Sequence, residues 1–174
     1  MRFEQILSDL EKKIYKPIYF LHGEEEFFID IVCDYIAGNV LSESEKEFNQ
    51  SVMYGKDVDV PAIIDTARRF PMMANHQVLI VKEAQEIDDL EKLKDYARDP
   101  VKTTILVICH KHKAYDSRKI LPKTIQKTGV VMKSDRMYDN KIPGWITDQL
   151  KEKGFSITPE ATRLLTASLG NDLV

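Results

Sequence analysis

The segment HGEEEFFID, residues 22–30, places a glycine and three consecutive glutamates directly after the apolar residues Tyr19, Phe20 and Leu21. A buried strand, a glycine bend and a helix start form the layout of a nucleotide phosphate site, because a helix N-terminus presents free N–H groups and a positive dipole end. A P-loop would read GxxxxGK[ST] here, with a lysine for the outer phosphates and a hydroxyl for magnesium. The segment contains neither residue. It therefore has the layout of a phosphate site without the phosphate ligands.

The three glutamates, Glu24, Glu25 and Glu26, suit a helix start better than a nucleotide site. A carboxylate near a helix N-terminus is stabilised by about 0.3–1 kcal/mol. A carboxylate about 4 Å from one phosphate charge would instead cost roughly 4 kcal/mol at an effective dielectric constant of 20. We expect a solvated helix start matched to the dipole, with a contact to a partner protein as the alternative. Both interpretations exclude ATP hydrolysis at this site.

A second candidate site is the segment RRFPMMANHQ, residues 68–77, between a predicted helix and a predicted strand. Pro71 ends the helix, because the residue before a proline is disfavoured in the α region, and Met72 and Met73 then lie on a short connector. Two adjacent side chains of a connector do not easily both face the core, so we expect at least one to be exposed. Methionine is flexible and polarizable, which suits an adaptable partner surface. The alternative is that the pair belongs to the core.

The remaining reactive side chains form no recognisable catalytic or metal site. His110, Lys111 and His112 lack a third histidine, cysteine or acid at ligand spacing, so no metal site is predicted. No Ser-His-Asp or Cys-His arrangement is indicated, and no cofactor is expected. The segment KHKAYDSRKILPK concentrates basic residues that could contact DNA phosphates or an acidic partner, namely Lys111, Lys113, Arg118, Lys119 and Lys123. A solvated loop and helix face is the alternative.

Composition narrows the class of protein. The chain has 174 residues, 43% of them apolar, which is enough for one substantial core and a second small one. Its net charge of −3 is opposite in sign to the positive charge typical of a dedicated nucleic-acid-binding domain. We therefore expect any DNA contact to be local or indirect. No apolar run approaches the roughly 18 residues of a membrane span. We expect a cytoplasmic protein without membrane contact, with Cys33 and Cys109 reduced.

The elements that must position these residues follow from the hydrophobic period, which switches repeatedly between helix and strand values. Helices are predicted at residues 3–14, 27–36, 59–70, 87–96 and 117–128, where Pro122 must kink or shorten the last one. The predicted strands are IYFLHG, EFNQSVMYG, QVLIV, TTILVIC and GVVMK. Strands separated by helices of this length indicate βαβ units. The sequence therefore predicts an α/β fold with a parallel five-stranded sheet flanked by helices.

The pattern changes after residue 135, and no strand signal follows. Residues 141–153 carry Ile142, Trp145 and Ile146 on one face, and Thr158 with Pro159 is typical of a second helix start. We expect a small helical unit over residues 136–174, with these three apolar residues as its core. The abrupt end at Val174 indicates a cut within a longer protein.

Taken in order, five segments resemble the bacterial DNA polymerase III delta subunit family over almost the whole chain. They are HGEEEFFID, FNQSVMYG, IIDTARRFPMMANHQVLIVKEA, TTILVICHKHKAYDSRKIL and WITDQLKEKGFSITPEATRLLTASLGNDL. The resemblance implies an AAA+-like α/β domain with a degenerate P-loop over residues 1–135, followed by part of a helical lid domain over residues 136–174. The family's C-terminal collar domain, which assembles the pentameric loader, is expected to be absent.

The resemblance also implies a function. Its members belong to the clamp loader and open the ring-shaped sliding clamp, the beta subunit, without hydrolysing ATP themselves. This chain would then be a part of the DNA polymerase III holoenzyme that has no catalytic activity of its own and meets DNA only through the complex. In VLIVKEA, Lys82 and Glu83 stand where an active ATPase has two adjacent acids, and a lysine cannot coordinate magnesium.

The resemblance assigns the clamp contact to the RRFPMMANHQ segment. Met72 and Met73 match two adjacent hydrophobic residues that enter a pocket on the clamp, where leucine and phenylalanine are common. The expected wedge comprises Phe70, Pro71, Met72, Met73 and Ala74, with Phe70 packed below to brace it against the sheet. An AAA+-like adapter, a helicase-loading module and a nucleotide-binding NTPase are the alternative functions.

Overall fold

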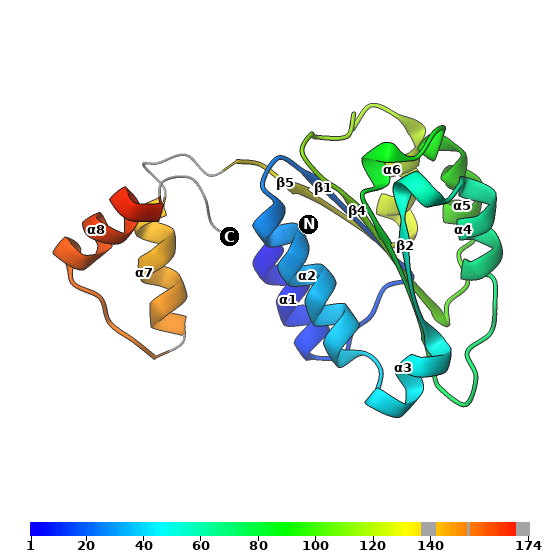
Figure 1. The fold of residues 1–174 in the computed structure, drawn as a ribbon, viewed down its shortest axis with the longest axis horizontal. Coiled ribbons are helices and arrows are strands. Elements are labelled where there is room, and N and C mark those ends of the chain that lie inside the picture. Colours follow the sequence, from blue (N-terminus) through cyan, green and yellow to red (C-terminus); the bar gives the residue numbers. More distant parts are fainter. Residues whose placement is uncertain (137–141, 153, 170–174) are drawn as a thin grey trace. The chain divides into compact units, whose positions relative to one another are not determined.

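The computed structural model describes residues 1–136, 142–152 and 154–169. The chain consists of two compact units, residues 1–134 and residues 135–174. Figure 1 shows the first unit as a sheet with helices on both faces, and the second as a pair of helices. Each unit is described by itself.

The first unit contains the predicted five-stranded sheet, and all of its strand pairs are parallel. The strands are β1 (Ile18–Gly23), β2 (Gln50–Tyr54), β3 (Gln77–Lys82), β4 (Thr104–His110) and β5 (Val130–Ser134), in the order β2-β3-β4-β1-β5. Every residue of β1 and β4 is buried, as expected of parallel strands that are covered on both faces. The predicted α/β fold class is confirmed.

Helices cover both faces of this sheet. One face carries α1 (Phe3–Glu11) and α2 (Glu26–Asn39), and the other carries α4 (Val60–Ala67), α5 (Lys94–Arg98) and α6 (Ile120–Thr128) (Figure 1). Each face has its own apolar core, because successive side chains of a strand point to opposite sides of the sheet. Phe20 of β1, for example, packs with the α4 side, whereas Tyr19 and Leu21 pack with the α2 side.

Three predicted elements differ from those observed. The residues 47–49, predicted to begin a strand, end the helix α3 (Glu43–Asn49), whose start is fixed by a capping box between Ser42 and Glu45. The helix predicted over residues 87–96 is divided into the 3₁₀ turn η3 (Leu90–Leu93) and α5. The last helix, α6, begins only at Ile120, so Pro122 lies in its first turn, where it is tolerated.

Short 3₁₀ turns and one cap complete the first unit. The turns η1 (Gly55–Asp57) and η2 (Ala84–Glu86) follow β2 and β3. The Asp59 side chain accepts a hydrogen bond of 2.9 Å from the Ala62 N–H and caps α4, which confirms the predicted helix start. Cys33 and Cys109 are buried free thiols.

The second unit contains α7 (Ile142–Glu152) and α8 (Pro159–Leu169). Ile142 and Ile146 are buried, and Trp145 is half-buried beside them on the same helix. The Thr158 hydroxyl accepts a hydrogen bond of 3.2 Å from the Ala161 N–H at the start of α8. The assignment of this unit to a lid domain stays a prediction. Across the residues that the structure describes, no helix has the length and hydropathy needed to cross a membrane.

The turn after β1 leaves no room for a side chain at Gly23. This glycine has φ of +148°, and a Cβ added to it would lie 1.8 Å from the carbonyl oxygen of Ser134. We expect Gly23→Ala to lower the free energy of unfolding by about 2 kcal/mol or more, because overpacking and a left-handed backbone both add cost. Urea unfolding followed by circular dichroism measures the change.

Gly38 provides the matched control for this substitution. It lies inside α2, and an added Cβ would meet no atom within 4 Å. Gly38→Ala should raise the free energy of unfolding by about 0.5–1 kcal/mol, because alanine is the better helix former. Equal effects of the two substitutions would contradict the close approach of Ser134 to Gly23.

Candidate functional site

The N-terminus of α2 is capped by the protein's own carboxylate. Glu25 precedes the helix, is buried, and accepts a hydrogen bond of 3.3 Å from the Phe27 N–H. Only Glu26 lies within α2, and Glu24 is exposed before it, so the predicted first turn of three glutamates is corrected to one. The capping carboxylate lies where a phosphate would meet the free N–H groups of the helix.

Two acids of α2 contact side chains from the loop after β4. Lys111 Nζ lies 2.7 Å from a carboxylate oxygen of Asp30 and 3.4 Å from one of Glu26. His112 Nδ1 lies 2.6 Å from the other Glu26 oxygen. Burial alone would lower the pKa of Lys111, but the hydrogen bond and charge of Asp30, with that of Glu26, outweigh it and raise the pKa. Lys111 therefore offsets part of the negative charge at this helix start.

This pairing changes the interpretation of the basic segment after β4. Lys111, predicted as a possible DNA or partner contact, is engaged by Asp30 and Glu26, and its side chain is only 19% exposed. Arg118 pairs with Asp116 at 2.9 Å, which lowers the pKa of that carboxyl to about 2. Lys113 and Lys119 are exposed. A contact through this segment stays a prediction for those residues.

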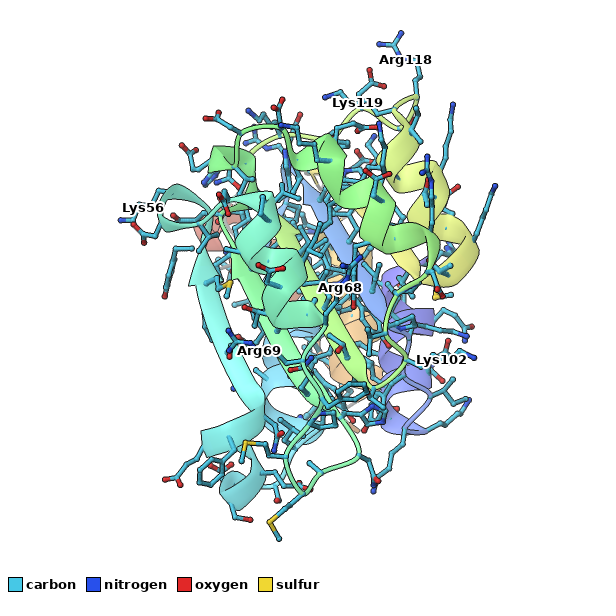
Figure 2. All side chains as sticks on the ribbon, turned by 90° about the vertical axis from the view of Figure 1, so that its right-hand side faces the viewer. Lys56, Arg68, Arg69, Lys102, Arg118 and Lys119 are labelled. Atoms are coloured by element: carbon cyan, nitrogen blue, oxygen red, sulfur yellow. The ribbon has the colours of Figure 1, made fainter. Side chains whose placement is uncertain are left out.

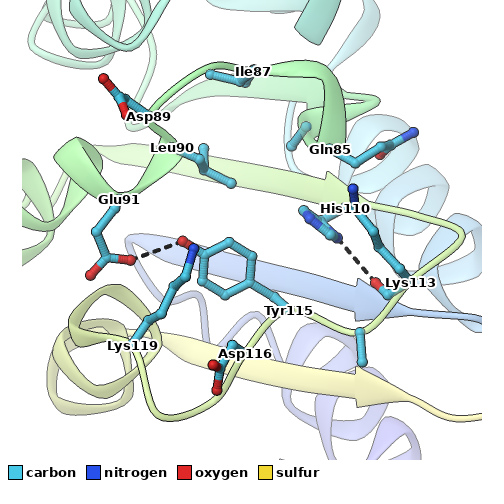
Figure 3. Close-up of a pocket in the computed structure, with 12 residues that line it drawn as sticks. Gln85, Ile87, Asp89, Leu90, Glu91, His110, Lys113, Tyr115, Asp116 and Lys119 are labelled. Carbon is cyan, nitrogen blue, oxygen red and sulfur yellow. Dashed lines mark hydrogen bonds between the residues drawn. The ribbon is translucent and has the colours of Figure 1, made fainter.

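A pocket of about 350 Å³ lies beside this segment, at the C-terminal ends of β3 and β4 (Figure 3). Several of its polar side chains bond within the fold. The Tyr115 hydroxyl donates to Glu91 at 2.9 Å, and Lys119 Nζ lies 4.9 Å from the Tyr115 ring centre. The second Glu91 oxygen accepts the N–H groups of Ile120 and Leu121 at the start of α6. These contacts join η3 to α6. They explain the polar side chains of the pocket by their role in holding the fold together.

The connector, residues 68–76 between α4 and β3, exposes three large apolar side chains. Phe70 is 83% exposed, Met72 61% and Met73 101%. The prediction that at least one methionine is exposed is confirmed. The expectation that Phe70 braces the segment from below is wrong, because α4 ends at Ala67 and Phe70 points away from the core.

Side chains at the starts of β3 and β4 bond to the end of α4. Thr104 Oγ1 donates to the Ala67 carbonyl at 2.7 Å, and Gln77 Nε2 lies 2.5 Å from the Arg69 carbonyl. Both side chains are buried. Pro71 has no N–H to donate to the Ala67 carbonyl, four residues before it, so the helix cannot continue through this residue. Thr104 and Gln77 instead satisfy carbonyl groups at the end of α4.

The middle of the connector is bound by α3. The Met72 N–H donates to Asn49 Oδ1 at 2.6 Å, and Asn49 Nδ2 donates to the Met72 carbonyl at 3.0 Å. Met73 follows with φ of +53°, the left-handed region, and Ala74 is half-buried against the α1 and α2 core. The contact of Asn49 with the connector was not predicted, because the sequence pattern assigned this residue to a strand. The capping-box spacing of Ser42 and Glu45 was the available signal for the helix.

The connector lies at the edge of the sheet where the strands begin, and the glycine turn lies at the edge where the strands end. The connector ends where β3 begins, whereas Gly23 ends β1, and the strands are parallel. A six-residue strand spans roughly 20 Å. Figure 2 shows Arg118 and Lys119 at one end of the α4 face and Arg69 nearer the other. The sequence-predicted residues therefore form two separate sites, and the connector is the one that presents apolar surface.

Comparison with known proteins places the chain in a family. The family model described as "DNA polymerase III, delta subunit" matches residues 19–134. The chain belongs to this family. A curated relative, DNA polymerase III subunit delta of Bacillus subtilis, is 23% identical over 178 residues, which cover 97% of this chain and 51% of the relative. The delta-family chain thus spans about half the length of that relative.

Solved structures give the same fold. The DNA clamp loader delta protein of Bacillus subtilis aligns with a TM-score of 0.83 and 23% identity, covering 99% of this chain and 54% of that one. The α/β fold predicted from the sequence is confirmed, and the AAA+-like assignment stays a prediction. A gamma subunit-related protein and a RuvB variant, both of Thermotoga maritima, align with TM-scores of 0.47 at 15% and 12% identity.

The ion pairs of Lys111 should contribute to the stability of the delta-family chain. We expect Lys111→Met to lower the free energy of unfolding by about 1 kcal/mol at pH 7, after allowing for the partial exposure of both acids. The raised pKa means that this contribution is fully present below the unfolded value of 10.5 and is lost as pH rises through the folded pKa. Urea unfolding at pH 7, 9 and 11 measures it.

Lys113→Met is the control, because Lys113 is exposed and belongs to none of the ion pairs found among the described residues. It should leave stability within about 0.5 kcal/mol of the wild type. A Lys111→Met variant as stable as this control at pH 7 would show that the pairs contribute nothing.

The carboxylates at the start of α2 lead to a prediction about nucleotide binding. We expect no heat of binding when ATP and Mg²⁺ are titrated into the chain by calorimetry, because Glu25 and Glu26 would repel the phosphates by roughly 4 kcal/mol per close pair of charges. Micromolar binding would overturn the view that carboxylates have replaced the phosphate at α2.

Proposed function

We propose that residues 1–134 bind the replicative sliding clamp, the beta subunit, through a wedge comprising Phe70, Pro71, Met72, Met73 and Ala74. The observation that carries the proposal is the exposure of Phe70, Met72 and Met73 on adjoining positions of one connector. Family membership supports the partner, since the clamp loader acts on the clamp.

Exposed apolar residues at adjoining positions indicate a binding site. Large apolar side chains gathered on the surface of a soluble domain mark partner sites more often than isolated ones do. Burying one methionine contributes about 1.5–3 kcal/mol, so the pair supplies roughly 3–6 kcal/mol before the costs of association. That free energy is sufficient to decide a modest interface.

Ring opening requires more than affinity. A ligand shifts an equilibrium only by its differential affinity for the two states, so the wedge must bind a distorted clamp interface better than a closed one. The chain would then favour the open ring by binding energy alone. The carboxylates at the start of α2 support this view, because they leave the chain without a phosphate site of its own.

The wider assembly follows from the same proposal. The delta subunit is a component of DNA polymerase III, and we infer that it joins the other loader subunits through its C-terminal domain. DNA is then reached through the complex. A titration of the clamp into this chain separates the proposal from an adapter or a helicase-loading module, neither of which binds the clamp.

The wedge is tested by Met72→Ala combined with Met73→Ala. We expect clamp binding to weaken at least tenfold, about 1.4 kcal/mol, because two apolar anchors are removed. The thermal melt should stay nearly unchanged, because both side chains are exposed. Fluorescence anisotropy with labelled clamp gives the affinity, and circular dichroism gives the melt.

Ile120→Ala is the matched control, since Ile120 is also an exposed apolar residue, 53% accessible, but lies after β4 at the opposite edge of the sheet. It should leave clamp binding unchanged. A collapse of the melt in the double variant would place the methionines in the core. Unchanged clamp binding with an unchanged melt would place the contact outside the connector.

A further inference from the structure

We propose that Asn49 is a positioning residue that holds the wedge in its binding conformation before a partner arrives. The proposal rests on the clamp-binding function above, which it deepens by naming the group that orders the wedge. Asn49 is the last residue of α3 and lies 23 positions before Met72 in the sequence. Its side chain contacts the Met72 backbone and leaves the Met72 side chain exposed.

The Asn49 side chain forms with the Met72 backbone the two hydrogen bonds that a neighbouring strand would otherwise form. The Asn49 amide accepts from the Met72 N–H at 2.6 Å and donates to the Met72 carbonyl at 3.0 Å. Only an amide side chain offers a neutral donor and acceptor side by side in this way. Because both backbone groups of Met72 are occupied, rotation of the connector about this residue would break two bonds at once.

The anchor itself is fixed. Asn49 is only 5% exposed, and its Nδ2 also donates to the Glu45 carbonyl at 3.0 Å within α3. Glu45 in turn forms the capping box with Ser42 at the other end of this helix. A buried amide tied to a capped helix gives the connector a rigid support.

The backbone after the anchor is strained in a way that needs such support. Met73 has φ of +53°, a conformation that a non-glycine residue adopts only when its surroundings hold it. Asn49 fixes Met72 directly before it, and half-buried Ala74 packs against the core directly after it. Between these two points Met73 projects with full exposure, at 101%.

Ordering the connector in advance lowers the entropic cost of association. Without the Asn49 amide, the Met72 N–H and carbonyl would bond to water, and the connector would sample many conformations. The wedge side chains would be unchanged, yet fewer molecules would present them correctly. The expected result is weaker clamp binding without the loss of any direct contact.

Asn49→Ala tests the proposal, and Asn39→Ala is its matched control. Asn39 Nδ2 donates to the carbonyl four residues before it, as Asn49 does, but Asn39 bonds only within α2. We expect Met72 amide hydrogen exchange to accelerate at least tenfold in Asn49→Ala while the β3 amides are unchanged. Clamp binding should weaken about three- to tenfold. Asn39→Ala should alter neither quantity.

A double-mutant cycle separates positioning from general stability. In the Met72→Ala and Met73→Ala background, Asn49→Ala should weaken clamp binding less than it does in the wild type, because two of the side chains that it positions are gone. A full additional loss in that background would overturn the proposal. So would normal clamp binding by Asn49→Ala when the methionine variant binds weakly.

The exchange measurement keeps the two proposals distinct. If the methionine variant binds the clamp normally, the wedge function fails, whereas Met72 exchange still tests the anchor. An unchanged Met72 exchange rate in Asn49→Ala overturns the anchor alone. If Asn49→Ala also exposes the β3 amides, the two rates are compared within that variant. A larger acceleration at Met72 than in β3 supports the anchor, and equal acceleration overturns it.

Discussion

The parallel direction of the five strands is the constraint on which the rest of the structure depends. It places every strand start at one edge of the sheet and every strand end at the other. The glycine turn and the ion pairs of α2 therefore lie at the edge of strand ends, and the connector lies at the edge of strand starts. About 20 Å of buried strand separates them.

At the edge of strand ends, internal charge has replaced a ligand. A helix start with free N–H groups attracts negative charge, and here Glu25 provides it. Further acids would be unfavourable if left alone, but Lys111 pairs with Glu26 and Asp30 and ties the loop after β4 to α2. The result is a structural junction in the place of a phosphate site. The same geometry that could hold a phosphate is used here to stabilise the fold.

The strands and their parallel direction could be predicted, because buried apolar runs alternate with helices along the chain and leave few alternatives. What could not be predicted depends on residues distant in sequence. Residues 47–49 alternate as a strand does, and only the cap upstream makes them helical. Phe70 has the spacing of the inner face of α4, but the helix ends at Ala67, where Thr104 bonds to the carbonyl that Pro71 leaves without a helical donor. Lys111 reads as a free cation because its partner, Asp30, lies 81 positions away.

The connector meets two opposing requirements by using different groups for each. Packing of exposed apolar side chains onto the protein surface would lower the free energy of the chain. A wedge therefore persists only if other groups hold its backbone in place. Polar side chains at the strand starts hold one end, and Asn49 holds the middle. The backbone thus fixes where the wedge lies, while flexible methionines adapt to the surface that they meet. In the proposed clamp contact, methionine in place of the leucine and phenylalanine implied by the family resemblance would change how tightly the wedge fits and leave its location unchanged.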